Sequence, residues 1–354
     1  MTSGFGEAAR EGGSSLDGPQ ARLEQRIRGL AELTGPSGHE EPVRQSIEAQ
    51  VRELADEVWV DALGNLFAHR RPRGPGGVRV MVAAHMDEIG VMVTHVDENG
   101  FLRFAPVGGV SPHVLLGQRL VFPNGAVGVV GSEPVEDIRD LKHDKLFLDI
   151  GAASAQEARD RVQVGDMAAY ARSVQTLGRR LVGKALDDRV GCAVVLEALD
   201  RLGESPHDIY AVFTVQEEVG TRGARPAAFR VAPEVALAVD VTASADTPKA
   251  RPLPMALGKG AAIKVKDGSV ITHTGLRRLL VERAKSHGIP YQMEVLDFGG
   301  TDAGPIHTSR DGVPSAVISV PTRYLHTPAE VVDMADVEAA VQLLVHVLRE
   351  PIHW

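Results

Sequence analysis

The stretch Val78-Arg79-Val80-Met81-Val82-Ala83-Ala84-His85-Met86-Asp87 joins an apolar, β-branched run to side chains that can bind metal ions. Similar apolar runs recur at residues 209–215, 235–239 and 315–319, and helical patterns occur at residues 189–202, 274–286 and 335–348. Runs this apolar are typical of central strands in an α/β sheet, because helices cover both faces of such a sheet. We therefore predict a mixed, largely parallel central sheet flanked by helices.

The segment from about residue 91 to residue 180 has a different texture. Glycine, proline and asparagine separate short apolar runs such as Arg119-Leu120-Val121-Phe122, a pattern typical of a small β-rich module. Since α/β sequence lies on both sides, we predict an inserted domain at 91–180 within a larger domain formed by 20–90 and 181–354. Residues 1–19 are rich in glycine, serine and charge, so we predict a flexible tail there.

Composition excludes several classes of protein. The 354 residues include 38 Lys and Arg against 47 Asp and Glu, a net charge of −9, which argues against a generally basic nucleic-acid binder. A single cysteine, Cys192, allows neither an internal disulfide nor a cysteine-based zinc site. No stretch reaches the roughly 18 uninterrupted apolar residues of a membrane span, and the N-terminus lacks an apolar signal core. We expect a cytoplasmic protein that binds neither nucleic acid nor membrane.

Each predicted central strand is followed by a group that can bind metal. Because ligands of open α/β sheets bind outside the carboxyl ends of the strands, we expect these groups to converge. Taken singly, such a histidine, acidic pair or helix-capping aspartate is usually an ordinary surface feature. Together they are not, since carboxylates beside buried strands are costly unless paired or metal-bound. The groups are His85, Glu217-Glu218, Asp240 and His326, with Asp187-Asp188 before the helix at 189–202.

This donor set favours a catalytic metal site. Two histidines and several carboxylates without a thiolate suit Zn²⁺, Co²⁺ or Mn²⁺. Residues i and i+2 of an extended chain face the same side, so Asp87 is expected to accept the second ring N–H of His85. Glu217 and Glu218 would face opposite sides of an extended strand, so one is expected to bind metal while the other handles protons. A carboxylate beside a metal-bound water is what hydrolysis needs.

Five motifs surround the candidate ligands and follow one another along the chain. They are Ala84-His85-Met86-Asp87-Glu88-Ile89-Gly90, Lys184-Ala185-Leu186-Asp187-Asp188-Arg189, Gln216-Glu217-Glu218-Val219-Gly220, Gly299-Gly300-Thr301-Asp302-Ala303-Gly304 and Arg323-Tyr324-Leu325-His326-Thr327-Pro328. With these motifs the chain resembles the M42 family of co-catalytic metal aminopeptidases, the tetrahedral or glutamyl-aminopeptidase-like enzymes. The resemblance runs in order from about residue 23 to residue 348.

The resemblance implies a dinuclear site that holds two divalent ions per subunit, Zn²⁺ or Co²⁺ with Mn²⁺ as a further option. Asp187 would bridge the two ions. His85 and Asp240 would complete one position, and Glu218 and His326 the other. Glu217 would be the general acid and base, with a metal-bound hydroxide as the nucleophile. The Asp187-Asp188 peptide would be cis.

The resemblance also implies a fold, a substrate pocket and an assembly. The larger domain would have the zinc-exopeptidase fold, and the insertion would be a small β-barrel, PDZ-like, that serves dimerisation. Gly300, Thr301 and Asp302 would lie at the substrate pocket. Peptides would be the substrates, and dimers would assemble into a homo-oligomer, a dodecamer.

Three alternative functions remain open at this point. A metal-dependent amidase or deacylase acting on N-acyl amino acids would use the same chemistry, but would not release amino acids from unblocked peptides. An endoglucanase-type glycosidase would use two carboxylates without a metal, so a chelator would leave its activity intact. A metal-stabilised binding module would show no turnover, and the presence of Glu217 beside the ligand set argues against it.

Overall fold

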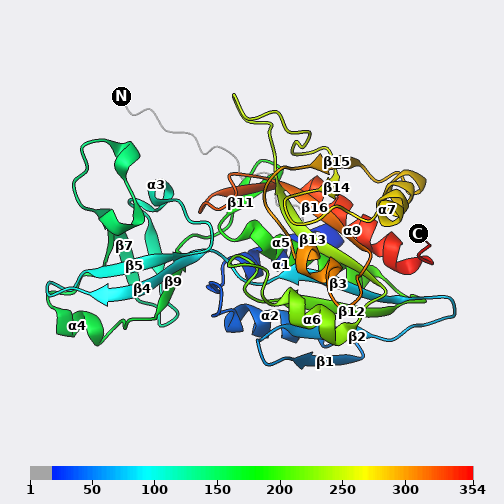
Figure 1. The fold of residues 1–354 in the computed structure, drawn as a ribbon, viewed down its shortest axis with the longest axis horizontal. Helices are drawn as coiled ribbons and strands as arrows, with labels where there is room; N and C mark the ends of the chain where they lie inside the picture. Colours follow the sequence, from blue (N-terminus) through cyan, green and yellow to red (C-terminus); the bar gives the residue numbers. More distant parts are fainter. Residues whose placement is uncertain (1–17, 354) are drawn as a thin grey trace, which may run out of the picture.

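The computed structural model describes residues 18–353, so most of the predicted flexible tail lies outside the described residues. Helix α1 (Pro19–Ala31) begins at the last residue predicted for that tail. The described chain forms a larger α/β body and a smaller barrel beside it (Figure 1). None of the described helices is both long and apolar enough to span a membrane.

A large mixed sheet runs through the α/β body. Its eleven described strands follow the order β1-β2-β12-β3-β13-β16-β17-β11-β10, with β14 paired to both β15 and β16. The strands are β1 (Glu57–Val60), β2 (Leu66–Arg70), β3 (Arg79–His85), β10 (Gln175–Leu177), β11 (Arg180–Gly183), β12 (Asp208–Thr214), β13 (Val235–Ala243), β14 (Ala261–Lys266), β15 (Tyr291–Val295), β16 (Ser315–Arg323) and β17 (Glu330–Asp333).

The four predicted apolar runs form the parallel centre of this sheet. β12, β3, β13 and β16 are neighbours, and each pairs in parallel with the next. Their carboxyl ends therefore meet at one edge. Antiparallel strands β2 and β17 flank this parallel centre on either side, which makes the sheet mixed and largely parallel at its core, as predicted.

Helices cover both faces of the sheet because side chains alternate along each strand. In β3, Val80 and Val82 pack into the larger core with α1, α2 (Glu41–Val51), α5 (Leu186–Arg201), α7 (Thr274–Ser286) and α9 (Met334–Arg349). Met81 and Ala83 face the other side, where α6 (Ala224–Val231) and α8 (Ala303–His307) pack. The absence of polar residues from this run follows from burial on both faces.

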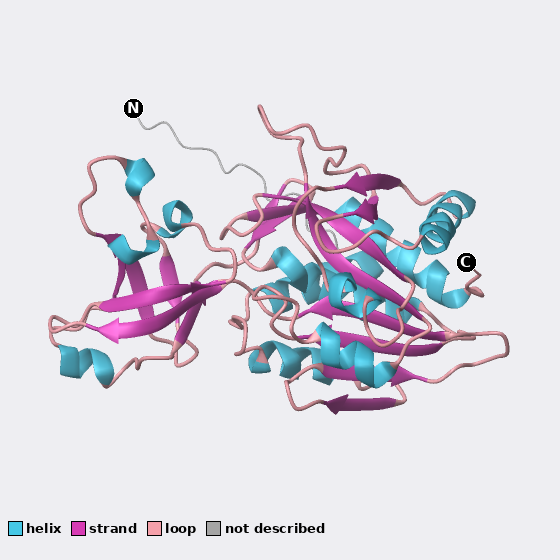
Figure 2. Ribbon diagram, in the orientation of Figure 1, coloured by secondary structure: helices cyan, strands magenta, loops and turns pink. Residues whose placement is uncertain are grey.

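The smaller part is a closed antiparallel barrel with its own apolar core (Figure 2). Its strands, in the order β4-β5-β8-β7-β6-β9, are β4 (Gly90–Val96), β5 (Leu102–Val107), β6 (Arg119–Val121), β7 (Val127–Ser132), β8 (Leu146–Asp149) and β9 (Met167–Tyr170). Short helices α3 (Pro112–Leu115) and α4 (Ala155–Arg159) and the 3₁₀ turns at Ile138–Asp140 and His143–Lys145 lie between the strands. The barrel strands thus end at Tyr170, and β10 already belongs to the large sheet. The predicted fold class, an α/β sheet with an inserted small β-barrel, is confirmed.

Candidate metal centre

The predicted metal ligands gather at the carboxyl edge of the parallel strands. His85 is the last residue of β3, Glu218 lies in the turn after β12, and His326 lies in the loop between β16 and β17. Asp187 lies in the first turn of α5. Asp240 does not follow its strand, because β13 continues to Ala243 and carries Asp240 inside it. All five side chains line one cleft of about 560 Å³.

Asp187 stands between two groups of donors. Its Oδ1 atom lies 3.1 Å from His85 Nε2, and the same ring nitrogen lies 3.9 Å from Asp240 Oδ1. Its Oδ2 atom lies 3.4 Å from His326 Nε2, which in turn is 3.3 Å from Glu218 Oε2. One carboxylate therefore faces a different imidazole with each of its oxygens.

The second ring nitrogen of His85 points toward Asp87. His85 Nδ1 lies 3.4 Å from Asp87 Oδ1 and 3.2 Å from the Asp87 carbonyl oxygen. The Asp87 carboxylate also accepts hydrogen bonds from the Ser37 hydroxyl (2.6 Å) and from the backbone N–H groups of Glu217 (2.9 Å) and Glu218 (3.1 Å). Asp87 thus orients the His85 ring and fixes the turn that carries the acidic pair.

The two glutamates do not lie in an extended strand, so that premise of the sequence argument is wrong. β12 ends at Thr214, Gln216 has a φ of 56°, and the N–H groups of Gly220 and Thr221 both donate to the Glu217 carbonyl. The two side chains differ in their place within this turn. The Glu218 carboxylate lies beside the His326 ring. Glu217 does not lie on the opposite face of a strand, because the strand has already ended.

The candidate centre gathers more carboxyl groups than cationic side chains, and burial makes the charged forms of these carboxyl groups costly. Burial, with repulsion from Asp187, raises the pKa of both Glu218 and Asp240 to about 8. Burial raises the pKa of Glu217 well above its usual range, and Asp240 and Asp302 add to this. Buried carboxylates in such excess are costly unless a cation accompanies them.

The pKa values of the two histidines are raised as well, but for an imidazole a raised pKa favours the charged form. Burial alone would lower the pKa of His326, but Asp187 and Glu218 outweigh it and raise the value to about 10. Burial would also lower the pKa of His85, but the hydrogen bonds with Asp187 and Asp87 outweigh burial. The pKa of His85 therefore rises well above its ordinary value. The site is therefore built for positive charge, and imidazole and carboxylate donors without a thiolate suit a divalent metal ion.

Ligand atoms of His85, Asp187 and Glu218 lie within 4.8 Å of one another, as do those of His85, Asp188 and Asp240. The Asp188 carboxylate is already engaged with the backbone: it accepts from the N–H groups of His85 (3.3 Å) and Gly191 (3.0 Å). The peptide between Asp187 and Asp188 is cis, as the family resemblance implied.

Sequence reasoning missed Glu330, the first residue of β17. Its Oε2 atom accepts the backbone N–H of Asp187 (3.0 Å), and its Oε1 atom accepts that of His326 (2.9 Å). The side chain is buried, which raises its pKa well above the usual range. The only signal in the sequence was an acidic residue that opens the apolar run Val331-Val332.

The barrel also reaches the centre. In the loop between β5 and α3, the Gly109 carbonyl oxygen lies 3.3 Å from His326 Nδ1. A Cβ atom at Gly109 would come within 2.4 Å of the same nitrogen. The approach requires glycine at this position, and no local pattern in the sequence indicated it.

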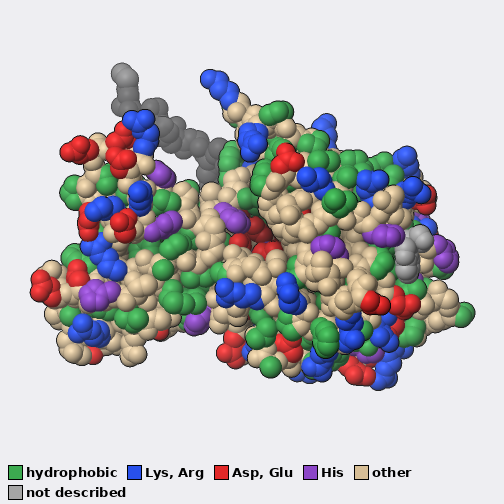
Figure 3. All heavy atoms as spheres, in the orientation of Figure 1, with side chains coloured by type: hydrophobic (Ala, Val, Ile, Leu, Met, Phe, Trp, Pro, Cys, Tyr) green, Lys and Arg blue, Asp and Glu red, His purple; other side chains and the backbone are tan. Residues whose placement is uncertain are grey.

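Of the predicted substrate-pocket residues, Gly300 and Thr301 line the cleft, whereas Asp302 does not. Asp302 is buried outside the cleft lining, and its Oδ2 atom accepts a hydrogen bond from the Thr214 hydroxyl at 2.5 Å. Acidic side chains gather in a hollow near the junction of the α/β body and the barrel (Figure 3). The cleft residues that the sequence analysis did not single out include Lys264, Asp267, Leu296 and Phe298.

The fold and this site define a class. A buried, acidic cleft with two histidines at the carboxyl edge of a parallel sheet is the arrangement of a hydrolytic metalloenzyme with α/β architecture. The family described as M42 glutamyl aminopeptidase matches residues 64–343. The chain belongs to this family of metal-dependent peptidases and is an aminopeptidase of the M42 type.

Individual relatives agree with this assignment. A protein of Acetivibrio thermocellus is 50% identical over 317 residues, which cover 89% of this chain and 95% of that protein. The aminopeptidase APDkam598 from the archaeon Desulfurococcus kamchatkensis superposes with a TM-score of 0.90 at 39% identity, covering 94% of this chain and 95% of that one. The TET1 peptidase of Pyrococcus horikoshii, described as able to assemble into a tetrahedron or a large octahedral shell, has a TM-score of 0.84 at 33% identity, covering 93% and 99% of the two chains.

Proposed function

We propose that this chain is a dinuclear aminopeptidase in which Asp187 bridges two divalent ions, Zn²⁺ or Co²⁺ with Mn²⁺ as a further option. His85 and Asp240 complete one position, and Glu218 and His326 complete the other. The observation that carries the proposal is that the two oxygens of the Asp187 carboxylate face different imidazoles. Oδ1 lies 3.1 Å from His85 Nε2, and Oδ2 lies 3.4 Å from His326 Nε2. Two further carboxylates, one beside each imidazole, supply the remaining donors.

When bound, such ions lower the pKa of a water molecule and polarise the scissile carbonyl. Glu217 is the residue that handles protons. Its carboxylate lines the cleft beside the ligands without being assigned to them, and its raised pKa brings proton uptake closer to neutral pH. Asp87 positions this turn and His85 through its hydrogen bonds.

The substrates are peptides, from which the enzyme removes N-terminal residues. Gly300 and Thr301 border the cleft beside the metal ligands, and Leu296 and Phe298 add apolar surface. Asp302 supports this pocket from outside the cleft lining. It accepts a hydrogen bond from Thr214, and its charge raises the pKa of Glu217.

We further propose the domain arrangement of the sequence analysis, with the catalytic domain at 20–90 and 181–354 and the inserted domain at 91–180. The barrel serves dimerisation, and dimers assemble into a closed homo-oligomer. The named assemblies of the Pyrococcus horikoshii peptidase support this proposal, as does the closed symmetry usual for homo-oligomers.

A substrate panel separates the proposed activity from its rivals. Unblocked aminoacyl chromogenic substrates, N-acyl amino acids and a soluble cellulose are each assayed with and without a chelator, followed by addition of Zn²⁺, Co²⁺ or Mn²⁺. We expect turnover of the unblocked substrates alone, lost with the chelator and restored by metal. Cleavage only of N-acyl amino acids would indicate a deacylase, and chelator-resistant cleavage of cellulose would indicate a glycosidase.

The roles of the adjacent glutamates are tested by a matched pair of variants. Glu217→Gln removes the proton acceptor but no ligand, so kcat should fall roughly 10²–10⁴-fold with little change in KM and with metal content near two per chain. Glu218→Gln replaces an anionic ligand with an amide, so metal content itself should fall and excess metal should restore part of the activity. Loss of metal in Glu217→Gln with retention in Glu218→Gln would mean that the two roles are reversed.

A further inference from the structure

Two histidines and a glutamate cluster at the contact between α7 and α9. His287 directly follows the last residue of α7, and His346 and Glu350 lie one helical turn apart at the end of α9. The Glu350 carbonyl oxygen lies 2.9 Å from Nε2 of His207, the residue that precedes β12. The cluster is therefore at the amino-terminal edge of the parallel strands, opposite the edge that carries the candidate metal centre.

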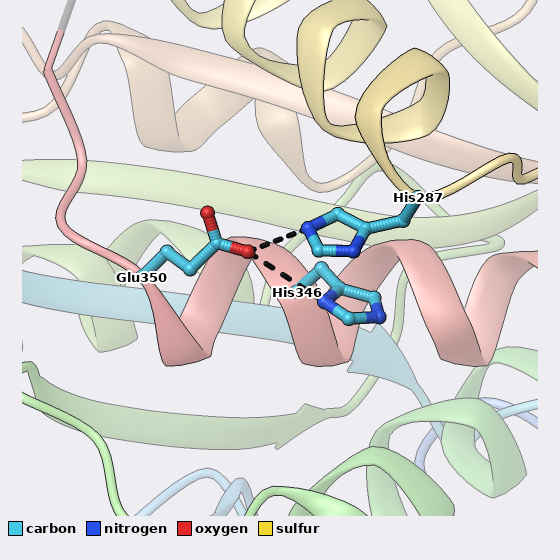
Figure 4. A group of neighbouring side chains, drawn as sticks. All are labelled: His287, His346 and Glu350. Atoms are coloured by element: carbon cyan, nitrogen blue, oxygen red, sulfur yellow. Dashed lines mark hydrogen bonds and ion pairs between the residues drawn. The ribbon is translucent and has the colours of Figure 1, made fainter.

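The three side chains face one another. Glu350 Oε1 lies 2.7 Å from His287 Nε2 and 3.6 Å from His346 Nδ1 (Figure 4). The two imidazole rings are stacked, with centroids 3.5 Å apart and planes inclined by 17°, and one nitrogen of each ring lies near the same carboxylate oxygen. Among the described residues, His346 Nδ1 is buried without a hydrogen-bond partner. A ligand atom from each residue lies within 4.8 Å of the other two.

Arg283 acts on this cluster in two ways. Its Nη1 atom pairs with Glu350 Oε2 at 2.6 Å, which turns Oε1 toward the histidines, as outer partners commonly orient a ligand. Its positive charge also opposes a bound cation. An ion here is therefore held less tightly than in the carboxylate-rich centre.

We propose that His287, His346 and Glu350 form a second, peripheral site for one divalent ion of the Zn²⁺, Cu²⁺ or Ni²⁺ type. Two imidazole nitrogens and a carboxylate oxygen within 4.8 Å of one another are the donors these ions prefer. Because the rings are stacked, binding requires the two imidazoles to rotate apart until both nitrogens face the ion, and water fills the remaining positions. The ion links the end of α7 to the end of α9.

The test compares three folded proteins: the unaltered enzyme, His287→Ala and His273→Ala. His273 is an exposed histidine at the opposite end of the same helix and serves as the matched control. After dialysis against micromolar Zn²⁺, the first and third proteins should contain about one more zinc ion per chain than His287→Ala. Aminopeptidase activity should be equal in all three, so failure of this site is distinguishable from failure of the catalytic centre.

A spectroscopic measurement identifies the side chains that bind the ion. With Cu²⁺ at one equivalent beyond saturation of the catalytic centre, electron paramagnetic resonance should show nitrogen ligation that His287→Ala weakens and His273→Ala does not. Glu350→Gln, which keeps both imidazoles, should lower the zinc content as well. This variant replaces His287→Ala in the test if circular dichroism shows that His287→Ala does not fold. Equal zinc content in the unaltered enzyme and in the folded variants would overturn the proposal.

Discussion

At the scale of single residues, Glu330 shows how one buried carboxylate can fix the relative positions of two segments of the chain. It accepts backbone N–H groups from Asp187 and His326, which lie 139 residues apart in the chain by their numbers, 326 minus 187. These two residues belong to α5 and to the β16–β17 loop, and their side chains meet at 3.4 Å in the proposed metal centre. Glu330 is a positioning residue, because it touches ligand backbones rather than substrate.

Glu330→Gln should loosen this arrangement. The amide keeps one acceptor but turns an NH₂ group toward the second backbone N–H, so one ligand loses its support. We expect metal affinity to fall roughly 10–100-fold, as loss of outer partners commonly causes, with activity recovering at high metal concentration. Competition with a chromophoric chelator measures this. Glu282→Gln, at an exposed position of α7, is the control, and equal affinities in the two variants would contradict the role assigned to Glu330.

The acidic ligands make the stability of the metal-free protein depend on pH. Burial and Asp187 raise the pKa of both Glu218 and Asp240 to about 8, against ordinary values of 4.5 and 3.8. The folded state therefore binds these protons more tightly than the unfolded chain does. Their contribution to stability is fully present below about pH 4 and is lost as pH rises toward about 8.

We expect the Tm of the metal-free protein to fall between about pH 5 and about pH 8, and addition of Zn²⁺ to release protons and remove most of that decline. Thermal scans across this range with and without metal measure it, and Glu218→Gln should show a shallower decline. A Tm that is flat or rises with pH in the metal-free protein would show that these carboxylates are not protonated there.

At the scale of elements, the loop between β5 and α3 ties the barrel to the catalytic body. Gly109 brings its carbonyl oxygen to 3.3 Å from His326 Nδ1. At Gly108, a Cβ atom would lie 3.2 Å from the Glu218 Cβ atom. Gly109 thus contacts His326, and Gly108 leaves no room for a side chain beside Glu218 without crowding it, so the loop of the barrel borders the proposed second metal position.

Gly109→Ala should therefore disturb catalysis although it lies outside the ligand set. The added methyl group would meet His326 Nδ1 at 2.4 Å, so the ring must move, and misplacement by about 1 Å can cost roughly 10²-fold in rate. Steady-state kinetics and metal content report the effect. Gly29→Ala on α1, where a Cβ atom meets nothing within 4 Å, should leave kcat unchanged, and equal kcat values for the two variants would argue against this contact.

At the scale of the whole molecule, the barrel presents apolar side chains to its surroundings. Along β7, Gly128 and Val130 are buried, whereas Val127 and Val129 are 48% and 47% exposed. Alternation along a strand places both exposed valines on the outer face of the barrel. These two valines are where the proposed role of the barrel in dimerisation can be tested, because a contact between copies of the chain through this face would bury them.

Light scattering should show a large closed homo-oligomer, a dodecamer built from dimers, and this assembly should trim peptides but not folded proteins. Val129→Glu should dissociate it, because a carboxylate would be buried in the contact without a partner. Ile271→Glu changes a side chain that is 76% exposed on the α/β body and should leave the assembly intact. Only monomer in the unaltered protein would contradict the assembly, and dissociation by Ile271→Glu alone would place the contact on the catalytic body.

What the sequence determined by itself follows from short-range physics. Apolar runs such as 78–83 and 235–239 predicted the buried parallel strands, because alternation and burial act on neighbouring residues. The change in sequence pattern near residue 91 predicted an inserted β-rich module, and the family resemblance implied that this module is a barrel. The ligand candidates could be named because each stands next to such a run, although β13 continued through Asp240 and the acidic pair proved to lie in a turn.

The tertiary structure alone decided how these residues meet. The two oxygens of Asp187 face different histidines, Glu330 joins the backbones of two ligands, and Gly109 approaches His326 from another part of the molecule. Apart from the bond between Glu330 and His326, which are four positions apart, these contacts join residues roughly a hundred or more positions apart, so no local periodicity carries a signal for them. They arise because the sheet brings its strand ends to one edge and the barrel packs against that edge, which depends on the packing of the whole chain.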